Sequence, residues 1–326
     1  MPVHIEETSG KAFLAFEGLE NFLQAELLER FGYSGATERF GRLFYCMDFP
    51  QEQEDPWFAQ TALQKPFVLR FESIGQAAAE LKKIQRSWAP YSFQFFRRAS
   101  LIQEKLPYIN FKERAFPTEI PNSPIGLYCL TGQNQILASA QTSSPLPAGK
   151  IAFVEDHVNP PSRAYLKIQE SLALFRHYFG TELPAPGQKC FEAGACPGGW
   201  TWVLTNLGAS VLAVDRAPLD DRLMKNPLVS FQARDAFTIP PQDVGPIDWL
   251  FSDVICYPER LYEWVQKWLS SGLCKNIICT IKMQGGVNWE AARAFAQIPG
   301  SRVVHLNYNK HELTWLHCGA LQRQAR

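Results

Sequence analysis

The amino-acid sequence predicts an α/β fold in two domains, the second of which is built on a mostly parallel, doubly wound sheet. The length of 326 residues corresponds to about two domains at roughly 150 residues each. From about residue 151, segments typical of strands alternate with segments typical of helices, which is the pattern of a doubly wound sheet. Two strand-like segments then follow each other at the end, which indicates an antiparallel last strand.

The second domain, 151–326, is expected to begin with a helix that has prolines at its start. Its helical segments have apolar residues at helical spacing; they are 159–179, 198–208, 259–272 and 289–298. Its strand-like segments are apolar and mostly short; they are 190–195, 210–215, 228–234, 247–253, 276–282, 301–308 and 312–319.

The first 150 residues predict a smaller α+β domain. Here the helix-like segments are 19–32 and 73–88, and the strand-like ones are 12–18 and 41–49. A hairpin is expected over 123–142, turning at 132–134, and the Pro- and Gly-containing run 143–150 is expected to be a linker or loop.

Charge is balanced over the whole chain but not along it. Lys plus Arg and Asp plus Glu both number 32, which excludes a protein that binds nucleic acid through bulk charge alone. Residues 1–80 hold 6 basic and 13 acidic residues, whereas residues 81–150 hold 9 basic and 3 acidic ones. The remainder, 151–326, holds 17 basic and 16 acidic residues.

The basic stretch is also rich in aromatic residues. Within 81–114 the cations are interleaved with aromatics, most densely in the run WAPYSFQFFRR at 88–98. Such a surface would stack bases and contact phosphates. The alternative is that the aromatics belong to the core, since one phase of the SFQFF run must face inward if it forms a strand.

Several classes of protein are not expected. The N-terminus carries acidic residues early and has no long apolar stretch, so no signal peptide is predicted, and no apolar run reaches the length of a membrane span, about 18 residues. None of the eight cysteines forms a CxxC pair, and the six histidines are scattered. We expect free, mostly buried thiols, no metal site and a cytoplasmic protein.

A glycine-rich turn follows the first strand of the second domain, where an open parallel sheet binds its ligand. The dinucleotide fingerprint GxGxxG is interrupted at Cys196, which disfavours a nicotinamide cofactor. Glu192 stands two residues before Gly194, and an acid there suits a cofactor with a positively charged amino group, such as S-adenosylmethionine. The turn itself comprises Gly194, Cys196, Pro197, Gly198, Gly199 and Trp200.

Carboxylates end the next three strands. Asp215 could accept hydrogen bonds from ribose hydroxyls, Asp235 could reach an adenine amino group, and Asp253 ends the fourth strand. Any one of them alone could be a solvated loop residue or a helix cap. Three in succession beyond a glycine-rich turn favour a binding site.

Two lysines and a second acid complete the candidate site. Lys282 closes an apolar strand, Lys167 lies on the helix before the sheet, and Glu312 opens the last strand. If that strand is antiparallel, Glu312 lies at the same edge as Lys282. Each of these residues could alternatively be a partner in a surface ion pair.

An ordered set of motifs resembles a known family. In sequence order, PSRAYLK, GACPGGWT, AVD, SD, the strand end IK and NKHELT are similar to those of the FtsJ-type ribose 2′-O-methyltransferases, in particular the bacterial 23S ribosomal RNA 2′-O-ribose methyltransferase M family. The resemblance covers 155–318 and implies a Rossmann-like S-adenosylmethionine-dependent methyltransferase domain. It implies a catalytic tetrad with Lys282 as proton acceptor: Lys167, Asp253, Lys282 and Glu312. It also implies that the methyl donor is held by Ser162, Glu192, the 194–200 turn, Asp215, Asp235 and Asp253.

The resemblance also bears on substrate and on the first domain. The family carries an N-terminal THUMP RNA-binding domain; residues 1–150 are shorter than that region, although FEGLENFLQAEL resembles its opening, so a reduced THUMP-like domain is expected. Glu192 stands where the family usually has Asp. We expect a monomer that methylates 23S ribosomal RNA. Alternatives are another RNA such as transfer RNA, a catalytically idle RNA-binding protein, which the tetrad disfavours, and a small-molecule methyltransferase, which the basic aromatic segment disfavours.

Overall fold

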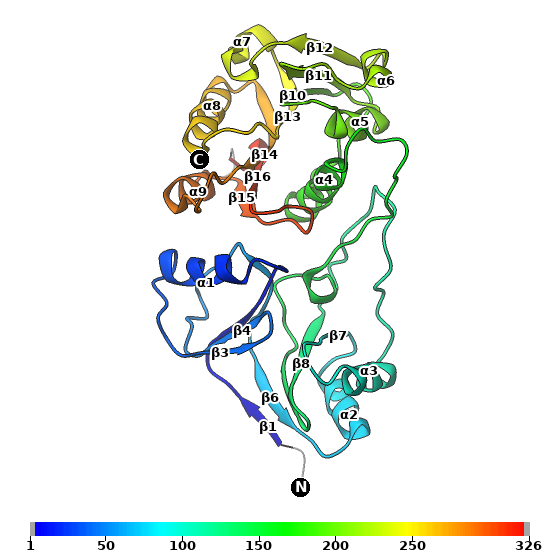
Figure 1. Cartoon of the computed structure of the whole chain (residues 1–326), viewed down its shortest axis with the longest axis vertical. Helices are drawn as coiled ribbons and strands as arrows, with labels where there is room; N and C mark the ends of the chain where they lie inside the picture. The colour runs from blue at the N-terminus through cyan, green and yellow to red at the C-terminus, as the bar shows by residue number, and fades with distance from the viewer. Residues whose placement is uncertain (1–3, 323–326) are drawn as a thin grey trace. The chain divides into compact units, whose positions relative to one another are not determined.

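The computed structural model describes residues 4–322 and divides into two compact units. Unit 1 runs up to Arg114 and includes Ile120–Ala152, and unit 2 comprises Ala115–Glu119 and the chain from Phe153 onward. Nothing in the sequence had indicated that 115–119 group with unit 2. Figure 1 shows the elements of both units.

Unit 1 is built from two sheets and three α-helices. Its helices are α1 (Glu20–Glu29), α2 (Ile74–Ile84) and α3 (Phe96–Lys105), with a short 3₁₀ turn at Pro147–Gly149. Its strands are β1 (His4–Glu7), β2 (Lys11–Ala15), β3 (Thr37–Phe40), β4 (Leu43–Cys46), β5 (Ala59–Leu63), β6 (Phe67–Arg70), β7 (Trp88–Tyr91), β8 (Gly126–Gly132) and β9 (Gln135–Ser139). One sheet has the order β1-β6-β9-β8-β7 and the other β3-β4-β2-β5.

Side chains of the five-stranded sheet of unit 1 point alternately to two different cores. Leu69 on β6 and Tyr128 on β8 pack with Leu81 of α2 and Ile102 of α3 on one side of the five-stranded sheet. Leu127, Cys129 and Leu137 point to the other side and pack on Ala12, Leu14 and Leu43 of the four-stranded sheet. Because successive side chains of a strand point to opposite faces, one sheet serves both cores.

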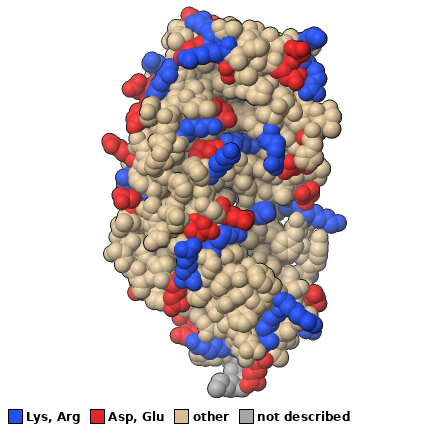
Figure 2. Space-filling view, in the orientation of Figure 1, with Lys and Arg blue, Asp and Glu red and all other residues tan. Residues whose placement is uncertain are grey.

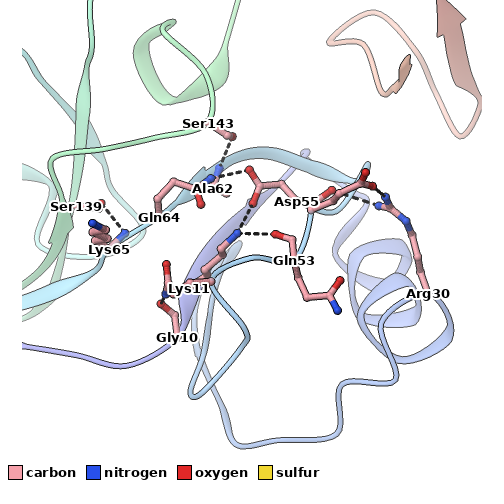
Figure 3. Close-up of polar contacts among 12 residues, drawn as sticks. Gly10, Lys11, Arg30, Gln53, Asp55, Ala62, Gln64, Lys65, Ser139 and Ser143 are labelled. Carbon is pink, nitrogen blue, oxygen red and sulfur yellow. Dashed lines mark hydrogen bonds and ion pairs between the residues drawn. The ribbon is translucent and has the colours of Figure 1, made fainter. Parts of the chain in front are cut away.

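Charged residues of unit 1 tether the segment 50–58. Lys11, which is almost fully buried, donates to the carbonyl of Gln53 at 2.8 Å and to Asp55 at 3.2 Å (Figure 3). Arg30 pairs with Glu26 at 2.9 Å and Glu54 at 2.6 Å. Part of the acidic excess of residues 1–80 is therefore engaged inside the unit.

The basic aromatic run 88–98 is part strand and part helix. β7 ends at Tyr91, α3 begins at Phe96, and residues 92–95 connect them, so no strand runs through SFQFF. The alternative that the aromatics belong to the core holds for Trp88 and Tyr91, which are buried, whereas Phe95 and Phe96 are exposed. The predicted hairpin is confirmed as β8 and β9, whereas the edge strands β1 and β3 were missed because their sequences, HIEE and TERF, are polar and almost wholly exposed.

Unit 2 contains a seven-stranded sheet in the order β12-β11-β10-β13-β14-β16-β15. The strands are β10 (Lys189–Ala193), β11 (Ser210–Asp215), β12 (Val229–Ala233), β13 (Ile247–Ser252), β14 (Cys274–Ile281), β15 (Ser301–Val304) and β16 (Leu313–Cys318). Neighbours from β12 to β14 pair in parallel, and β16 pairs antiparallel with both β14 and β15. The predicted α/β class is confirmed.

Helices cover both faces of this sheet, with α4 and α5 on one side and α8 and α9 on the other (Figure 1). The helices are α4 (Tyr165–Phe179), α5 (Gly199–Asn206), α6 (Asp221–Met224), α7 (Pro241–Val244), α8 (Pro258–Ser271), α9 (Trp289–Ala296) and α10 (Gly319–Gln322), with a 3₁₀ turn at Ala236–Thr238. α4 begins six residues later than expected, and before it Asp156 accepts hydrogen bonds from the amides of Val158 and Asn159 and closes a turn. Within residues 4–322, no helix is long and apolar enough to cross a membrane.

The strand order reverses between β10 and β13, so these two strands flank the point where ligands of such sheets bind. β10 is followed by the glycine-rich turn, and β13 is followed by Asp253. The Asp253 amide donates to the Ala193 carbonyl at 3.3 Å, so the two segments leave the sheet side by side.

Candidate active site

The register of β16 against β14 brings two of the predicted site residues together. Ile281 is opposite Leu313 in this antiparallel pair. The next residue on β14 is Lys282, and the residue before Leu313 is Glu312. Because antiparallel partners keep a constant sum of residue numbers, Lys282 and Glu312 meet at the end of the pair.

Two ion pairs join the four candidate catalytic residues. Lys282 Nζ lies 2.6 Å from Asp253 Oδ1. Lys167 Nζ, in the first turn of α4, donates a hydrogen bond to Glu312 Oε1. All four side chains are only 11–22% exposed, so water screens the two ion pairs only in part.

The pKa of Glu312 is affected by the lysines of both ion pairs. Burial by itself would raise the pKa of Glu312, but the hydrogen bond and positive charge of Lys167, together with the charge of Lys282, lower it to about 2. Glu312 is therefore ionised throughout the neutral range and is a fixed negative group close to the side chains of Lys167 and Lys282.

The glycine-rich turn is shaped by close approaches. Gly194 has a φ of +76°, and a Cβ there would lie 2.8 Å from Val254 Cγ2 on the segment after β13. A Cβ on Gly199 would lie 2.6 Å from Ser162 Oγ. Both positions therefore exclude larger residues, and the turn packs closely against Val254 and Ser162.

Ser162 faces the start of α5 with an unused hydroxyl. Its Oγ is buried and has no hydrogen-bond partner within residues 4–322. The neighbouring backbone is fixed, because Trp200 Nε1 donates to the Ala164 carbonyl at 3.0 Å. A buried polar atom without a partner in a native fold points to a ligand or water that supplies one.

Glu192 is a buried carboxyl at the end of β10. It is 2% exposed, and the Thr201 hydroxyl donates to its Oε2 at 2.6 Å. Burial raises the pKa of Glu192 to about 8, and the charges of Asp253 and Asp215 add to the rise, although Thr201 opposes it. A protonated acid next to two carboxylates is a site where a bound cation would be stabilised.

Asp215 and Asp235 end the next two strands, as expected. Asp215 accepts from the amides of Cys196 at 3.0 Å and Ala217 at 3.1 Å, which holds its carboxylate against the turn. Asp235 caps the 3₁₀ turn at Phe237 and pairs with Arg216 at 2.9 Å and Arg260 at 3.1 Å. Burial tends to raise the pKa of Asp235, but these hydrogen bonds lower it below its usual value.

Sequence reasoning missed three charged residues around this edge. Arg216 and Arg260 share Asp235, and only the tertiary fold brings α8 to that strand end. Glu170, one turn beyond Lys167, is fully buried, and a glutamate within an amphipathic helical pattern gave no signal of this. Of the eight cysteines, only Cys196 is exposed, and no cluster of three metal-binding side chains occurs among the residues described.

Comparison with known proteins finds similarity over the segment that carries this edge of the sheet. The FtsJ-like methyltransferase family model matches residues 160–285. Ribosomal RNA large subunit methyltransferase M of Xanthomonas euvesicatoria pv. vesicatoria is 34% identical over 167 residues, which are 50% of this chain and 47% of that protein. The protein of the same name from Xanthomonas oryzae pv. oryzae gives the same identity and coverage.

The segment that the FtsJ-like model matches is only part of the chain. The chain spans about half the length of the relatives it matches. Lys167, Asp253 and Lys282 lie inside the matched segment, whereas Glu312 lies beyond it on the last strand pair. Among solved structures, magnesium protoporphyrin IX methyltransferase from Synechocystis is similar with a TM-score of 0.34 and 13% identity, covering 47% of this chain and 79% of that one.

The raised pKa of Glu192 predicts how stability changes with pH. The folded state keeps a proton on Glu192 between about 4.5 and 8 that the unfolded chain has lost, so this contribution to the free energy of unfolding falls as the pH rises through 8. Urea denaturation at pH 6 and pH 8.5 should show Glu192→Gln losing about 2 kcal/mol less than the wild type over this interval. The exposed Glu290→Gln variant serves as control and should match the wild type. Equal losses in Glu192→Gln and wild type would contradict the assignment.

Proposed function

We propose that unit 2 transfers a methyl group from S-adenosylmethionine to a ribose 2′-hydroxyl of RNA, with large-subunit ribosomal RNA as the substrate. The observation that carries the proposal is the meeting of two lysine–carboxylate pairs beside the glycine-rich turn. The FtsJ-like match supports methyl transfer, and the names of the relatives support the choice of RNA.

The residues around the turn fit the methyl donor. The buried Ser162 hydroxyl, which has no partner within residues 4–322, suits a ligand that binds beside the glycine-rich turn. Asp215 keeps lone pairs for ribose hydroxyls, and Glu192 would release its proton beside a cationic amino group. Asp235, which already pairs with Arg216 and Arg260, would accept a further hydrogen bond from the adenine amino group. When bound, the donor supplies a methyl group on a positively charged sulfur.

The chain's own residues would move the proton. As the ribose oxygen forms its bond to the methyl carbon and the carbon–sulfur bond breaks, the hydroxyl proton passes to Lys282 Nζ. Lys282 can accept the proton only when its amine is neutral. Asp253 orients the amine at 2.6 Å and takes part in holding the resulting ammonium group. The remainder of the rate enhancement comes from positioning.

Replacing Lys282 tests this function. Lys282→Ala should reduce single-turnover methyl transfer to RNA by about 10²–10⁴-fold, because the proton acceptor is gone, while calorimetry shows donor affinity within a few-fold of wild type. Lys275→Ala is the matched control, since Lys275 starts the same strand and pairs with Asp248, also at 2.6 Å. Transfer by Lys282→Ala at a rate near wild type would remove Lys282 from the mechanism.

We propose that the RNA also contacts unit 1, through a surface formed by α3 and the segment after it, which we call the α3 surface. Among the large apolar side chains of unit 1 that are exposed, all the aromatic ones lie here: Phe95 (39%), Phe96 (64%), Tyr108 (78%) and Phe111 (55%). Figure 2 shows basic side chains gathered over α2 and α3. Exposed aromatic rings among cations are what stacking of unpaired bases requires.

The cations of the α3 surface differ in their surroundings. Arg98 donates to Asn134 at 2.7 Å and lies over the Phe71 ring, so it supports the fold of unit 1. Arg97, Lys105 and Lys112 are exposed. A test of RNA contact should therefore change Arg97 and Lys112 and leave Arg98 intact.

Reversing these two charges should weaken RNA binding in a salt-dependent way. Arg97→Glu with Lys112→Glu should lower affinity and flatten the dependence of log affinity on log salt by about 0.7 per lost phosphate contact, since fewer counterions are released. Arg39→Glu with Lys65→Glu, an exposed pair elsewhere in unit 1, is the control. Filter binding across a salt series measures both quantities. Unchanged affinity and slope in the first variant would assign the α3 surface to ordinary solvated structure.

A further inference from the structure

Glu170 is a buried carboxyl that the proposed reaction does not use. It lies on α4 three residues after Lys167, which places both side chains on the same face of the helix. Glu170 is 1% exposed, and its partners all belong to the loop between β15 and β16.

The carboxyl of Glu170 holds the start of that loop. Its Oε1 accepts from the Asn307 amide at 2.9 Å and from Asn307 Nδ2 at 2.7 Å, and its Oε2 accepts from the Tyr308 amide at 3.1 Å. Burial raises the pKa of Glu170 to about 7 despite these three donors. Without the carboxyl, two backbone amides would lose their acceptor.

The same loop ends in Glu312. From Tyr308 onward it is closed by Asn309, whose Nδ2 donates to the Glu312 carbonyl at 2.9 Å and to Thr314 Oγ1 at 3.1 Å. The His311 amide donates to Glu312 Oε2 at 3.1 Å. Helix α4 therefore contacts the loop at both ends, through Glu170 at its entry and through Lys167 at Glu312 (Figure 1).

We propose that Glu170 is a positioning residue, which anchors the β15–β16 loop to α4 so that the Glu312 carboxylate meets Lys167. The proposal rests on the proposed function, in which this ion pair adjoins the proton acceptor. Glu170 touches neither substrate nor donor and acts through Glu312. A general structural role would instead lower stability and leave the geometry of the pair unchanged.

A double-mutant cycle separates the two roles. Glu170→Gln keeps one acceptor oxygen but sets an amide group against the Tyr308 N–H; we expect single-turnover transfer to fall at least 10-fold, with donor and RNA affinities within 2-fold. In a Glu312→Gln background the same substitution should change the rate less than 3-fold, because its target is already absent. An equal factor in both backgrounds, or no effect in the wild type, would overturn the proposal.

Two further variants keep the test independent of folding. Asn307→Ala removes one of the three hydrogen bonds to Glu170 and should lower the single-turnover transfer rate by a smaller factor than Glu170→Gln. Phe175→Leu changes a fully buried residue of α4 that packs on Trp249, away from the loop, and should lower stability without changing the rate.

Hydrogen exchange gives a readout that needs no activity. In Glu170→Gln, the amides from Asn307 to His311 should exchange at least 10-fold faster than in wild type, whereas Phe175→Leu should leave their relative protection unchanged. Unaltered exchange at these amides would refute the positioning role. If the wild type transfers no methyl group at all, the proposed function fails, and the exchange experiment still decides whether Glu170 holds the loop.

Discussion

The antiparallel pairing of β16 with β14 is the constraint on which the candidate active site depends. A sheet whose strands were all parallel would bring only their carboxyl ends to this edge. Reversing the last strand brings an amino end there as well, and with it Glu312. The register then sets Glu312 beside Lys282, and α4 supplies Lys167 from the layer above. A slip of one residue in β16 would turn Glu312 to the opposite face.

Electrostatics divides this edge into two parts. On one side, Glu312 and Asp253 are each paired with a lysine, and the pKa of Glu312 is lowered to about 2. On the other side, the pKa of Glu192 is raised to about 8 by burial and by neighbouring carboxylates. Paired charges hold the geometry where a proton would move, and an unpaired buried acid remains where a cationic ligand would bind. The fold thus places a buried acid of raised pKa on β10 close to the ion pair that follows the neighbouring strand β13.

Much of unit 2 could be predicted because its strands are apolar runs that end in a charged or glycine residue, as in FEAG, LAVD and CTIK. The site residues at these ends followed from the rule that ligands bind there. Pairings could not be predicted: Lys167 with Glu312 depends on the packing of α4, and Arg260 reaches Asp235 only because α8 returns to β12. Unit 1 was harder, since the edge strands β1 and β3 are polar and α3 interrupts a run that looked extended. The position of Glu170 depends on a loop 137 residues away in sequence.

We propose that this site methylates the 2′-hydroxyl of a ribose in large-subunit ribosomal RNA. The most direct measurement is mass spectrometric mapping of methylated nucleotides in RNA from cells with and without the protein. We expect a 2′-O-methylated nucleotide of the large-subunit RNA to disappear with the protein and to return with the wild-type chain or Lys275→Ala, but not with Lys282→Ala. An unchanged set of 2′-O-methyl groups, or loss of a base methylation or of a transfer RNA methylation in their place, would contradict the claim.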